Sequence, residues 1–261
     1  MLPTNPKTDQ KKLRQQIKKS HIPKHIALIM DGNGRWAKAH SLSRAEGHKR
    51  GAAAVDLLMD ACLDLKIPCV SLFAFSTENW RRPKTEIRAL FNLLDAYIID
   101  KLPKMKQNGI RFRVSGDISK LPRKSQRLIE DGLEQTRKNR AMLLNFCLNY
   151  GSRDEIIHAA HRMVQARAEK LPAKPSASDL KKLQKKPTAR EFEKFLYTDQ
   201  LPDVDLLIRT SGELRISNFL LYQCAYAELY FTDVHWPDFD ESELYKSIID
   251  FQNRQRRYGG L

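Results

Sequence analysis

The chain contains 261 residues, carries a formal net charge of +15, and is 41% hydrophobic and 30% charged. These fractions are ordinary for a water-soluble globular protein. We expect no membrane span, because no apolar run approaches ~20 residues, and no secretory signal, because residues 1–20 are polar and lysine-rich. The positive charge favours anionic partners, namely nucleic acid, anionic lipid or phosphorylated small molecules.

The first predicted strand is the apolar run 26–30, which is typical of a strand buried on both faces of a parallel sheet. It ends at Asp31, and a Gly-Asn-Gly turn at 32–34 leads into a helix that opens at Arg35. A carboxylate, a glycine-rich turn and a helix start can together hold a phosphate and its Mg²⁺. Taken alone, the stretch could equally be a tight turn whose aspartate caps the helix. It matches neither a Walker A loop nor a dinucleotide-binding motif.

Strands and helices alternate along the rest of the chain. Further strands are predicted at 70–75, 111–114, 142–148, 204–208 and 229–231. Helices are predicted at 55–65 (preceded by the basic stretch 44–50), 87–98, 124–138 (exposed), 156–164, 219–226 and 243–256. Two lysine-rich segments complete the pattern: a flexible, partly helical arm at 1–20, and a mobile surface segment at 171–202 with one helix near 189–196.

This alternation predicts an α/β fold with a largely parallel sheet flanked by helices. Ligands of such sheets bind outside the carboxyl ends of the strands. Three predicted strand ends carry unusual polar residues, namely Asp31, the segment 76–82 and the segment 209–217. We therefore treat 21–261 as one catalytic domain that draws its site from both ends of the chain.

Several motifs at these strand ends match a known family in order. They are the segments 25–38, 44–48, 75–83, 205–213, 215–219, 227–234 and 236–239. They resemble the cis-prenyltransferases, most closely the bacterial undecaprenyl diphosphate synthases. The resemblance implies repeated condensation of isopentenyl diphosphate onto an allylic diphosphate, usually farnesyl diphosphate, to give a long polyprenyl diphosphate for cell-wall synthesis. It also implies Mg²⁺, a homodimer, and an apolar tunnel along the helix at 90–98.

The resemblance assigns roles to individual positions. The metal carboxylates are Asp31 and Glu228. The allylic diphosphate is held by Gly32, Asn33, Gly34 and Arg35, with help from Arg44 and His48, and the isopentenyl diphosphate by Arg209, Arg215 and Ser217. Trp36 and Ile216 also belong to the expected substrate-binding residues. Further substrate contacts come from Ser76, Thr77, Glu78, Trp80 and Arg82, and the tail residues Arg257 and Gly259 reach the partner subunit's site. Leu214 departs from relatives that carry histidine there, which affects only a secondary polar role.

Asn79 occupies the position often assigned to proton removal. A neutral amide is a very poor base, so we expect Asn79 to orient a substrate oxygen or a water instead. Simpler structural roles stay open for four other residues. Glu228 could form a structural ion pair, Trp36 and Trp80 could be core aromatics, and His48 could neutralise a helix end.

Two rival functions compete with this prediction. A non-catalytic subunit of a two-component prenyltransferase would lose the phosphate loop, which this chain keeps. An RNA-binding protein is suggested by charge alone, but no aromatic residues interleave with the basic runs, so we expect no nucleic acid partner. Four scattered cysteines without a Cys-x-x-Cys motif indicate a cytoplasmic protein. The lysine-rich segments suggest peripheral contact with anionic lipid at the inner face of the membrane.

Overall fold

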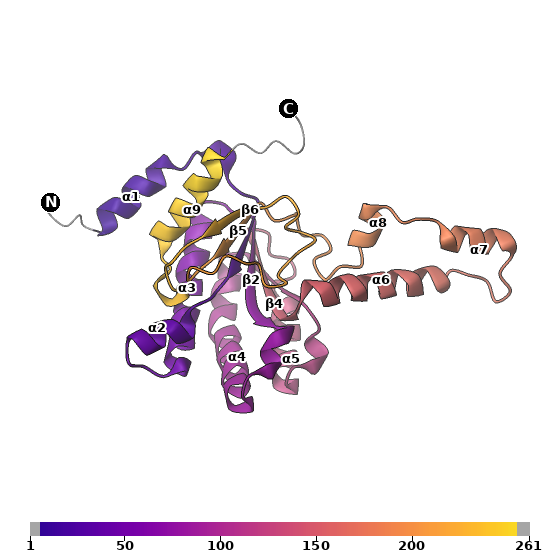
Figure 1. Cartoon of the computed structure of the whole chain (residues 1–261), viewed down its shortest axis with the longest axis horizontal. Helices are drawn as coiled ribbons and strands as arrows, with labels where there is room; N and C mark the ends of the chain where they lie inside the picture. Colours follow the sequence, from indigo (N-terminus) through magenta and orange to yellow (C-terminus); the bar gives the residue numbers. More distant parts are fainter. Residues whose placement is uncertain (1–5, 255–261) are drawn as a thin grey trace.

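The computed structural model describes residues 6–254 and contains a six-stranded sheet in the order β3-β4-β2-β1-β5-β6 (Figure 1). Every neighbouring pair in this sheet is parallel, which confirms the predicted α/β class. The strands are β1 (His25–Ile29), β2 (Cys69–Ser76), β3 (Ile110–Ser115), β4 (Met142–Tyr150), β5 (Leu206–Arg209) and β6 (Glu228–Phe231). In this strand order β1 lies near the centre of the sheet, so Asp31, which follows β1, lies near the middle of the sheet's edge.

Both faces of the sheet are covered, which explains why β1 is apolar without a break. Ile26 and Leu28 point into the larger core, and Ala27 and Ile29 point into a smaller core on the opposite face. The larger core is built by α3 (Arg44–Asp64), α4 (Lys84–Gln107), α5 (Arg123–Thr136) and α9 (Glu241–Asn253). The smaller core is closed by residues from the segments on either side of β5, including Phe219 and Leu220.

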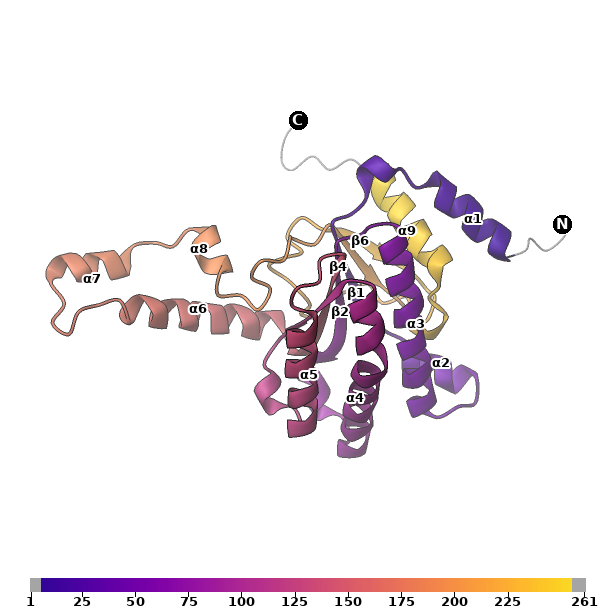
Figure 2. The ribbon, with the colours of Figure 1, turned by 180° about the vertical axis from the view of Figure 1, so that it is seen from behind.

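The predicted N-terminal arm contains a helix, and the end of the arm packs on the body of the protein. Residues Pro6–Gln16 form the helix α1, which lies beside α9 in both views of the ribbon (Figures 1 and 2). Ile17 is buried in the larger core, and Leu13 packs against it. Arg14 also forms an ion pair with Asp64 at the end of α3. Among the described residues, no helix has both the length and the apolar character needed to cross a bilayer.

The segment after β4 projects from the body of the protein (Figure 2). It consists of α6 (Ser152–Ala168), α7 (Ala177–Gln184) and α8 (Ala189–Glu193). The sequence predicted only one helix within 171–202, and α7 is the one that was missed. α7 was missed because a short stretch with a lysine pair looks like a solvated loop in the sequence.

Two other predicted elements need correction. The segment 219–226 is a series of turns rather than a helix, and positive φ angles at Asn218 and Leu220 interrupt any helical path. The helix α5 is not exposed all round, because Ile129 and Gly132 are among its buried residues and face the core. In addition, α3 begins at Arg44, so the basic stretch that was expected to precede this helix forms its first turns.

A cavity of about 370 Å³ lies beside β1 and β2, where α3 and α4 contribute its walls. Its mouth is polar and includes Asp31 and Asn79, while its deeper wall is apolar. The apolar lining comprises Val55, Phe75, Leu90, Phe91, Leu93, Leu94, Tyr97, Phe146 and Leu148. The predicted apolar tunnel along 90–98 is therefore present, and it opens beside the carboxyl end of β1.

Candidate active site

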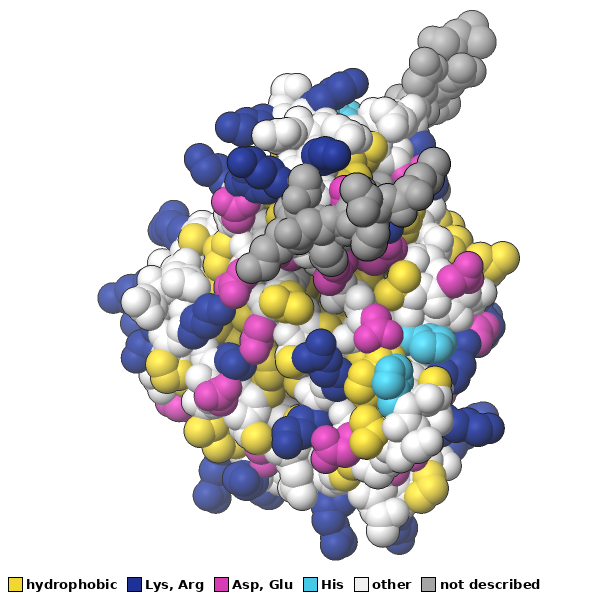
Figure 3. Space-filling model, turned by 90° about the vertical axis from the view of Figure 1, so that its left-hand side faces the viewer, with side chains coloured by type: hydrophobic (Ala, Val, Ile, Leu, Met, Phe, Trp, Pro, Cys, Tyr) yellow, Lys and Arg dark blue, Asp and Glu magenta, His cyan; other side chains and the backbone are white. Residues whose placement is uncertain are grey.

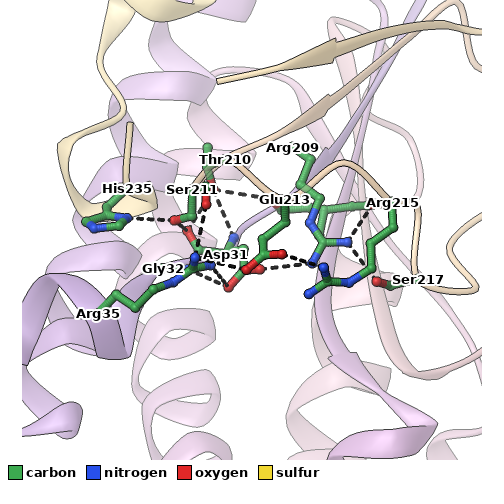
Figure 4. A network of polar contacts seen from close by, with 11 residues as sticks. Asp31, Gly32, Arg35, Arg209, Thr210, Ser211, Glu213, Arg215, Ser217 and His235 are labelled. Atoms are coloured by element: carbon green, nitrogen blue, oxygen red, sulfur yellow. Dashed lines mark hydrogen bonds and ion pairs between the residues drawn. The ribbon is translucent and has the colours of Figure 1, made fainter. Parts of the chain in front are cut away.

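Asp31 stands two residues beyond β1 and is the centre of a polar network (Figure 4). Its Oδ2 accepts a hydrogen bond from Arg209 Nη2 at 2.9 Å, and its Oδ1 lies 3.2 Å from Arg35 Nη2. The Gly32 N–H donates to the same Oδ1 at 2.7 Å. Thr210 fixes the backbone of Asp31, accepting from its N–H and donating to its carbonyl. The carboxylate is thus held rigidly at the cavity mouth.

The charge state of Asp31 follows from these neighbours. Partial burial works to raise the pKa of its carboxyl group. The hydrogen bond from Arg209 and the charges of Arg209 and Arg35 outweigh that effect, so the pKa lies below its ordinary value. Asp31 is therefore ionised at neutral pH, which is the state required of a metal ligand.

Arg209 is the most deeply placed cation of the network, since its side chain is only 5% exposed. It ends β5, next to Ile29 of β1 in the parallel register. Its Nη1 donates to the carbonyl of Arg215 at 2.5 Å and to Ser217 Oγ at 2.7 Å. Its buried Nε has no hydrogen-bond partner among the described residues. The predicted grouping of Arg209 with Arg215 and Ser217 is present.

Glu213 links the remaining arginines of this group. Its Oε1 accepts from Arg35 Nη1 at 3.0 Å, and its Oε2 is bonded to Arg215. The hydrogen bond from Arg215 lowers the pKa of Glu213, so it too is ionised. Two carboxylates and three guanidinium groups therefore form one network (Figure 4). They come from the turn after β1, from α2 (Asn33–Ala39), from the end of β5 and from the loop after β5.

The turn after Asp31 requires glycine at its first position. Gly32 has φ +103°, and a Cβ there would lie 1.9 Å from Ser211 Oγ. Ser211 donates to the carbonyl of Asp31 and is bonded to His235 Nδ1 at 2.7 Å. The turn is thus clamped between the loops that follow β5 and β6, and Ile216 is partly buried against the smaller core behind them.

The end of β2 supplies the next group of predicted residues. The side-chain carbonyl of Asn79 accepts from the Ser76 N–H at 3.1 Å, and Asn79 lines the cavity. Glu78 Oε1 accepts from Asn218 at 3.2 Å, which connects this loop to the one carrying Ser217. Thr77 bonds Asp154 at the start of α6. The loops after β2 and β5 therefore meet beside the cavity.

Three cationic or titratable side chains line the cavity mouth on the side of α3 and α4. They are Arg44, His48 and Arg82. Burial, reinforced by the charge of Arg82, lowers the pKa of His48 to about 4, so the imidazole is neutral at pH 7. Glu86 bonds both arginines and was not singled out from the sequence.

Two predicted aromatic contacts do not line the cavity. The Trp36 indole N–H donates to Asp238 at 2.8 Å, and its ring stacks on His40. The Trp80 indole N–H donates to Asn149 at 2.7 Å, while its ring packs edge-on against Phe75 of the cavity wall. Their direct contact with substrate stays a prediction. Arg257 and Gly259 lie outside the described residues.

Glu228 is far from Asp31 in this chain, so the structure does not bring the two predicted metal carboxylates together. It begins β6 and pairs with Leu206, which in turn pairs with Ile26 of β1. Asp31 lies five residues beyond Ile26, a separation of about 16 Å along the strands at the usual rise per residue. Glu228 instead accepts from Arg254 at 2.9 Å. The structural ion pair is the interpretation that the geometry supports.

The sequence did contain signals for the residues that were overlooked. Thr210, Ser211 and Glu213 follow the fifth predicted strand, where a parallel sheet places its site. Glu86 offered a weaker signal, because Arg82, four residues before it, precedes the helix α4. His235 offered no comparable signal, because the turn that brings it to Ser211 depends on tertiary packing.

The donor set around Asp31 suits a metal that is shared with a substrate. Mg²⁺ prefers hard oxygen ligands and is commonly held by one or two carboxylates together with phosphate oxygens. Asp31 offers one ionised carboxylate at the cavity mouth, beside arginines that could take the remaining phosphate oxygens. Among residues 6–254 no cluster of three His, Cys, Asp or Glu side chains could hold an ion.

Comparison with known proteins identifies relatives over nearly the whole chain. The family model described as "Putative undecaprenyl diphosphate synthase" matches residues 29–259. An isoprenyl transferase of Leptospira interrogans is 52% identical over 242 residues, covering 93% of this chain and 97% of the relative. An isoprenyl transferase of Bacillus cereus is 45% identical over 249 residues, covering 95% and 93% respectively.

Solved structures agree with these sequence matches. A crystal structure of a lavandulyl diphosphate synthase from Lavandula x intermedia, in complex with dimethylallyl diphosphate, has a TM-score of 0.83 at 29% identity, covering 92% of this chain and 99% of that one. One described as a probable undecaprenyl diphosphate synthase from Campylobacter jejuni has a TM-score of 0.73 at 37% identity, covering 91% and 98%. The chain belongs to the undecaprenyl diphosphate synthase family of isoprenyl transferases.

Proposed function

We propose that the protein is a Mg²⁺-dependent cis-prenyltransferase that adds isopentenyl diphosphate repeatedly to farnesyl diphosphate. Its product would be a long polyprenyl diphosphate, namely undecaprenyl diphosphate, which serves as lipid-carrier precursor for cell-wall synthesis. The single observation that carries this proposal is the position of Asp31, which is paired with Arg209, at the mouth of a cavity whose deeper wall is apolar. Such a cavity fits a molecule with a charged head and a long hydrocarbon tail.

The proposed chemistry divides between two anion sites. The turn at 32–34, with Arg35, Arg44 and His48, would hold the allylic diphosphate, and Arg209 with the loop 215–217 would hold isopentenyl diphosphate. A Mg²⁺ ion on Asp31 would supply charge neutralisation for the departing diphosphate. The guanidinium groups stabilise the same developing charge and keep the two substrates aligned for attack of the isopentenyl double bond on the allylic carbon. Loss of a proton then completes each addition.

Asn79 would act in this scheme by orientation and not as a base. Its carbonyl oxygen already accepts from the Ser76 N–H, and its amide N–H groups can donate to a substrate oxygen or a water. We predict that Asn79→Ala lowers the rate but leaves both limbs of the pH–rate profile in place. Loss of one limb alone would support the role as proton acceptor.

The decisive experiment is an incorporation assay with radiolabelled isopentenyl diphosphate and farnesyl diphosphate, with Mg²⁺ or with EDTA. We expect butanol-extractable polymer only when Mg²⁺ is present, and its length gives the product directly. Absence of polymer under every condition would favour the alternative, a non-catalytic partner subunit. The retained phosphate loop around Asp31 and Arg35 supports the catalytic function.

We also propose that the protein works as a homodimer that contacts anionic membrane surfaces from the cytoplasm. Exposed lysines on or beside α1 and α7, such as Lys11, Lys18, Lys181 and Lys185, support the contact, at up to about 1 kcal/mol each. Lys and Arg are also spread over the face shown in Figure 3, among Asp and Glu. Salt-insensitive binding to vesicles containing anionic lipid would refute the contact, and sedimentation of a monomer would refute the dimer.

A further inference from the structure

Glu86 lies in the first turn of α4, and none of the predicted motif roles includes it. Its Oε2 accepts from Arg44 Nη1 at 2.9 Å, and its Oε1 accepts from Arg82 Nη1 at 3.0 Å. The same Oε1 lies 4.0 Å from Nε2 of His48. The Glu86 side chain is only 14% exposed, so water competes weakly for its oxygens.

The three partners of Glu86 come from elements that surround the cavity mouth. Arg44 is the first residue of α3, and His48 stands one turn further along that helix. Arg82 ends the loop that carries Asn79. All four of these residues line the cavity, whereas Glu86 stands behind them. One carboxylate therefore connects α3, α4 and the loop after β2.

Arg44 lies against the glycine turn that follows Asp31. A Cβ built on Gly34 would lie 3.1 Å from Arg44 Nε, so the guanidinium packs directly against the glycine turn. Glu86 uses only Nη1 of each arginine, which leaves the other N–H groups of both forks for an anion. The guanidinium groups of Arg44 and Arg82 and the turn 32–34 thus line the same part of the cavity mouth.

We infer that Glu86 is a positioning residue that holds Arg44 and Arg82 in the geometry required to grip the allylic diphosphate. This inference rests on the proposed function, because it names the ligand as the allylic diphosphate. A long arginine loses rotamer freedom when it binds an anion, and a carboxylate that restrains it beforehand removes part of that cost. Arg44 is otherwise 61% exposed and would sample many rotamers.

The opposite effect is physically possible, and it makes the inference testable. A carboxylate next to two arginines also competes with the anion for their charge. If competition dominated, removal of Glu86 would tighten diphosphate binding, because the local positive potential would rise. If positioning dominates, removal weakens binding. The sign of the change therefore decides between the two.

The experiment compares Glu86→Gln and Glu86→Asp with wild-type protein. We measure inorganic pyrophosphate binding by calorimetry and steady-state kinetics for each substrate. For Glu86→Gln we expect pyrophosphate affinity to fall and KM for farnesyl diphosphate to rise roughly tenfold. KM for isopentenyl diphosphate should stay the same, because Arg209 binds elsewhere. Glu86→Asp keeps the charge and should recover part of the loss.

The matched control is Asp60→Asn, which removes another α3–α4 ion pair, that with Lys104, away from the cavity. We expect wild-type KM values for it. The inference is overturned if Glu86→Gln binds pyrophosphate as tightly as wild type or more tightly, or if Asp60→Asn shows an equal loss. Wild-type protein that makes no polymer contradicts the proposed function instead, whatever the Glu86 variants do.

Discussion

The most informative single substitution is Arg209→Lys, which keeps the positive charge and removes the fork. Arg209 donates to three acceptors, on Asp31, Arg215 and Ser217, at 2.9, 2.5 and 2.7 Å. A single ammonium group in the same buried site cannot reach all three. Two charge-assisted hydrogen bonds should be lost, and each contributes about 1.5–3 kcal/mol.

If about 3 kcal/mol of that loss applies to the transition state, kcat/KM falls by roughly two orders of magnitude. We expect this fall in the labelled incorporation assay, with a lower urea midpoint because Arg209 is buried. The matched control is Arg137→Lys, an exposed arginine paired with Glu134, which should retain both values. An Arg209→Lys protein with the wild-type kcat/KM would refute our account of this residue.

Three further predictions follow from the geometry. Gly32→Ala should abolish polymer synthesis and lower the melting temperature, because φ is +103° and the new Cβ would collide with Ser211 Oγ. The incorporation assay measures the first effect and circular dichroism the second. An active variant would contradict the turn geometry. Tyr97→Ala should lengthen the product, because the ring lines the cavity and its hydroxyl bonds Asp56. Reverse-phase chromatography measures the chain length of the product. An unchanged chain length would show that Tyr97 does not limit it. The pKa of Asp31 is lower in the folded protein than its ordinary value, so the ionised carboxylate stabilises the fold at pH values above the pKa of the unfolded chain. This stabilisation is lost as the pH falls through the pKa of the folded protein. The gap in urea midpoint between wild type and Asp31→Asn should therefore narrow below about pH 4, and a gap constant with pH would contradict this.

The central strands and the phosphate turn were predictable because their signals are local. The run 26–30 is apolar without a break, and only glycine suits the φ of position 32. The position of each carboxylate before or after its strand also indicates that Asp31 and Glu228 lie far apart. Asp31 follows its strand, whereas Glu228 precedes the apolar run of its own, so a parallel sheet places the two at opposite ends.

Other features depended on contacts between distant residues. Glu86 lies just before the helix predicted at 87–98, and its partner Arg44 lies on another element, so the sequence did not bring the two together. The segment 219–226 has enough apolar residues for a helix, but two neighbouring positive φ angles and packing under the sheet make it irregular. The N-terminal helix α1 is held by Ile17, whose burial against the larger core no local pattern revealed.

The central claim is that the Asp31 carboxylate, gathered with Arg35 and Arg209, serves a departing diphosphate. Its most direct test is the initial rate of polymer synthesis by Asp31→Ala with saturating Mg²⁺, in protein shown by circular dichroism to be folded. We predict a loss of about a thousandfold or more, as expected for removal of a main electrostatic contributor. Synthesis at the wild-type rate would contradict the account.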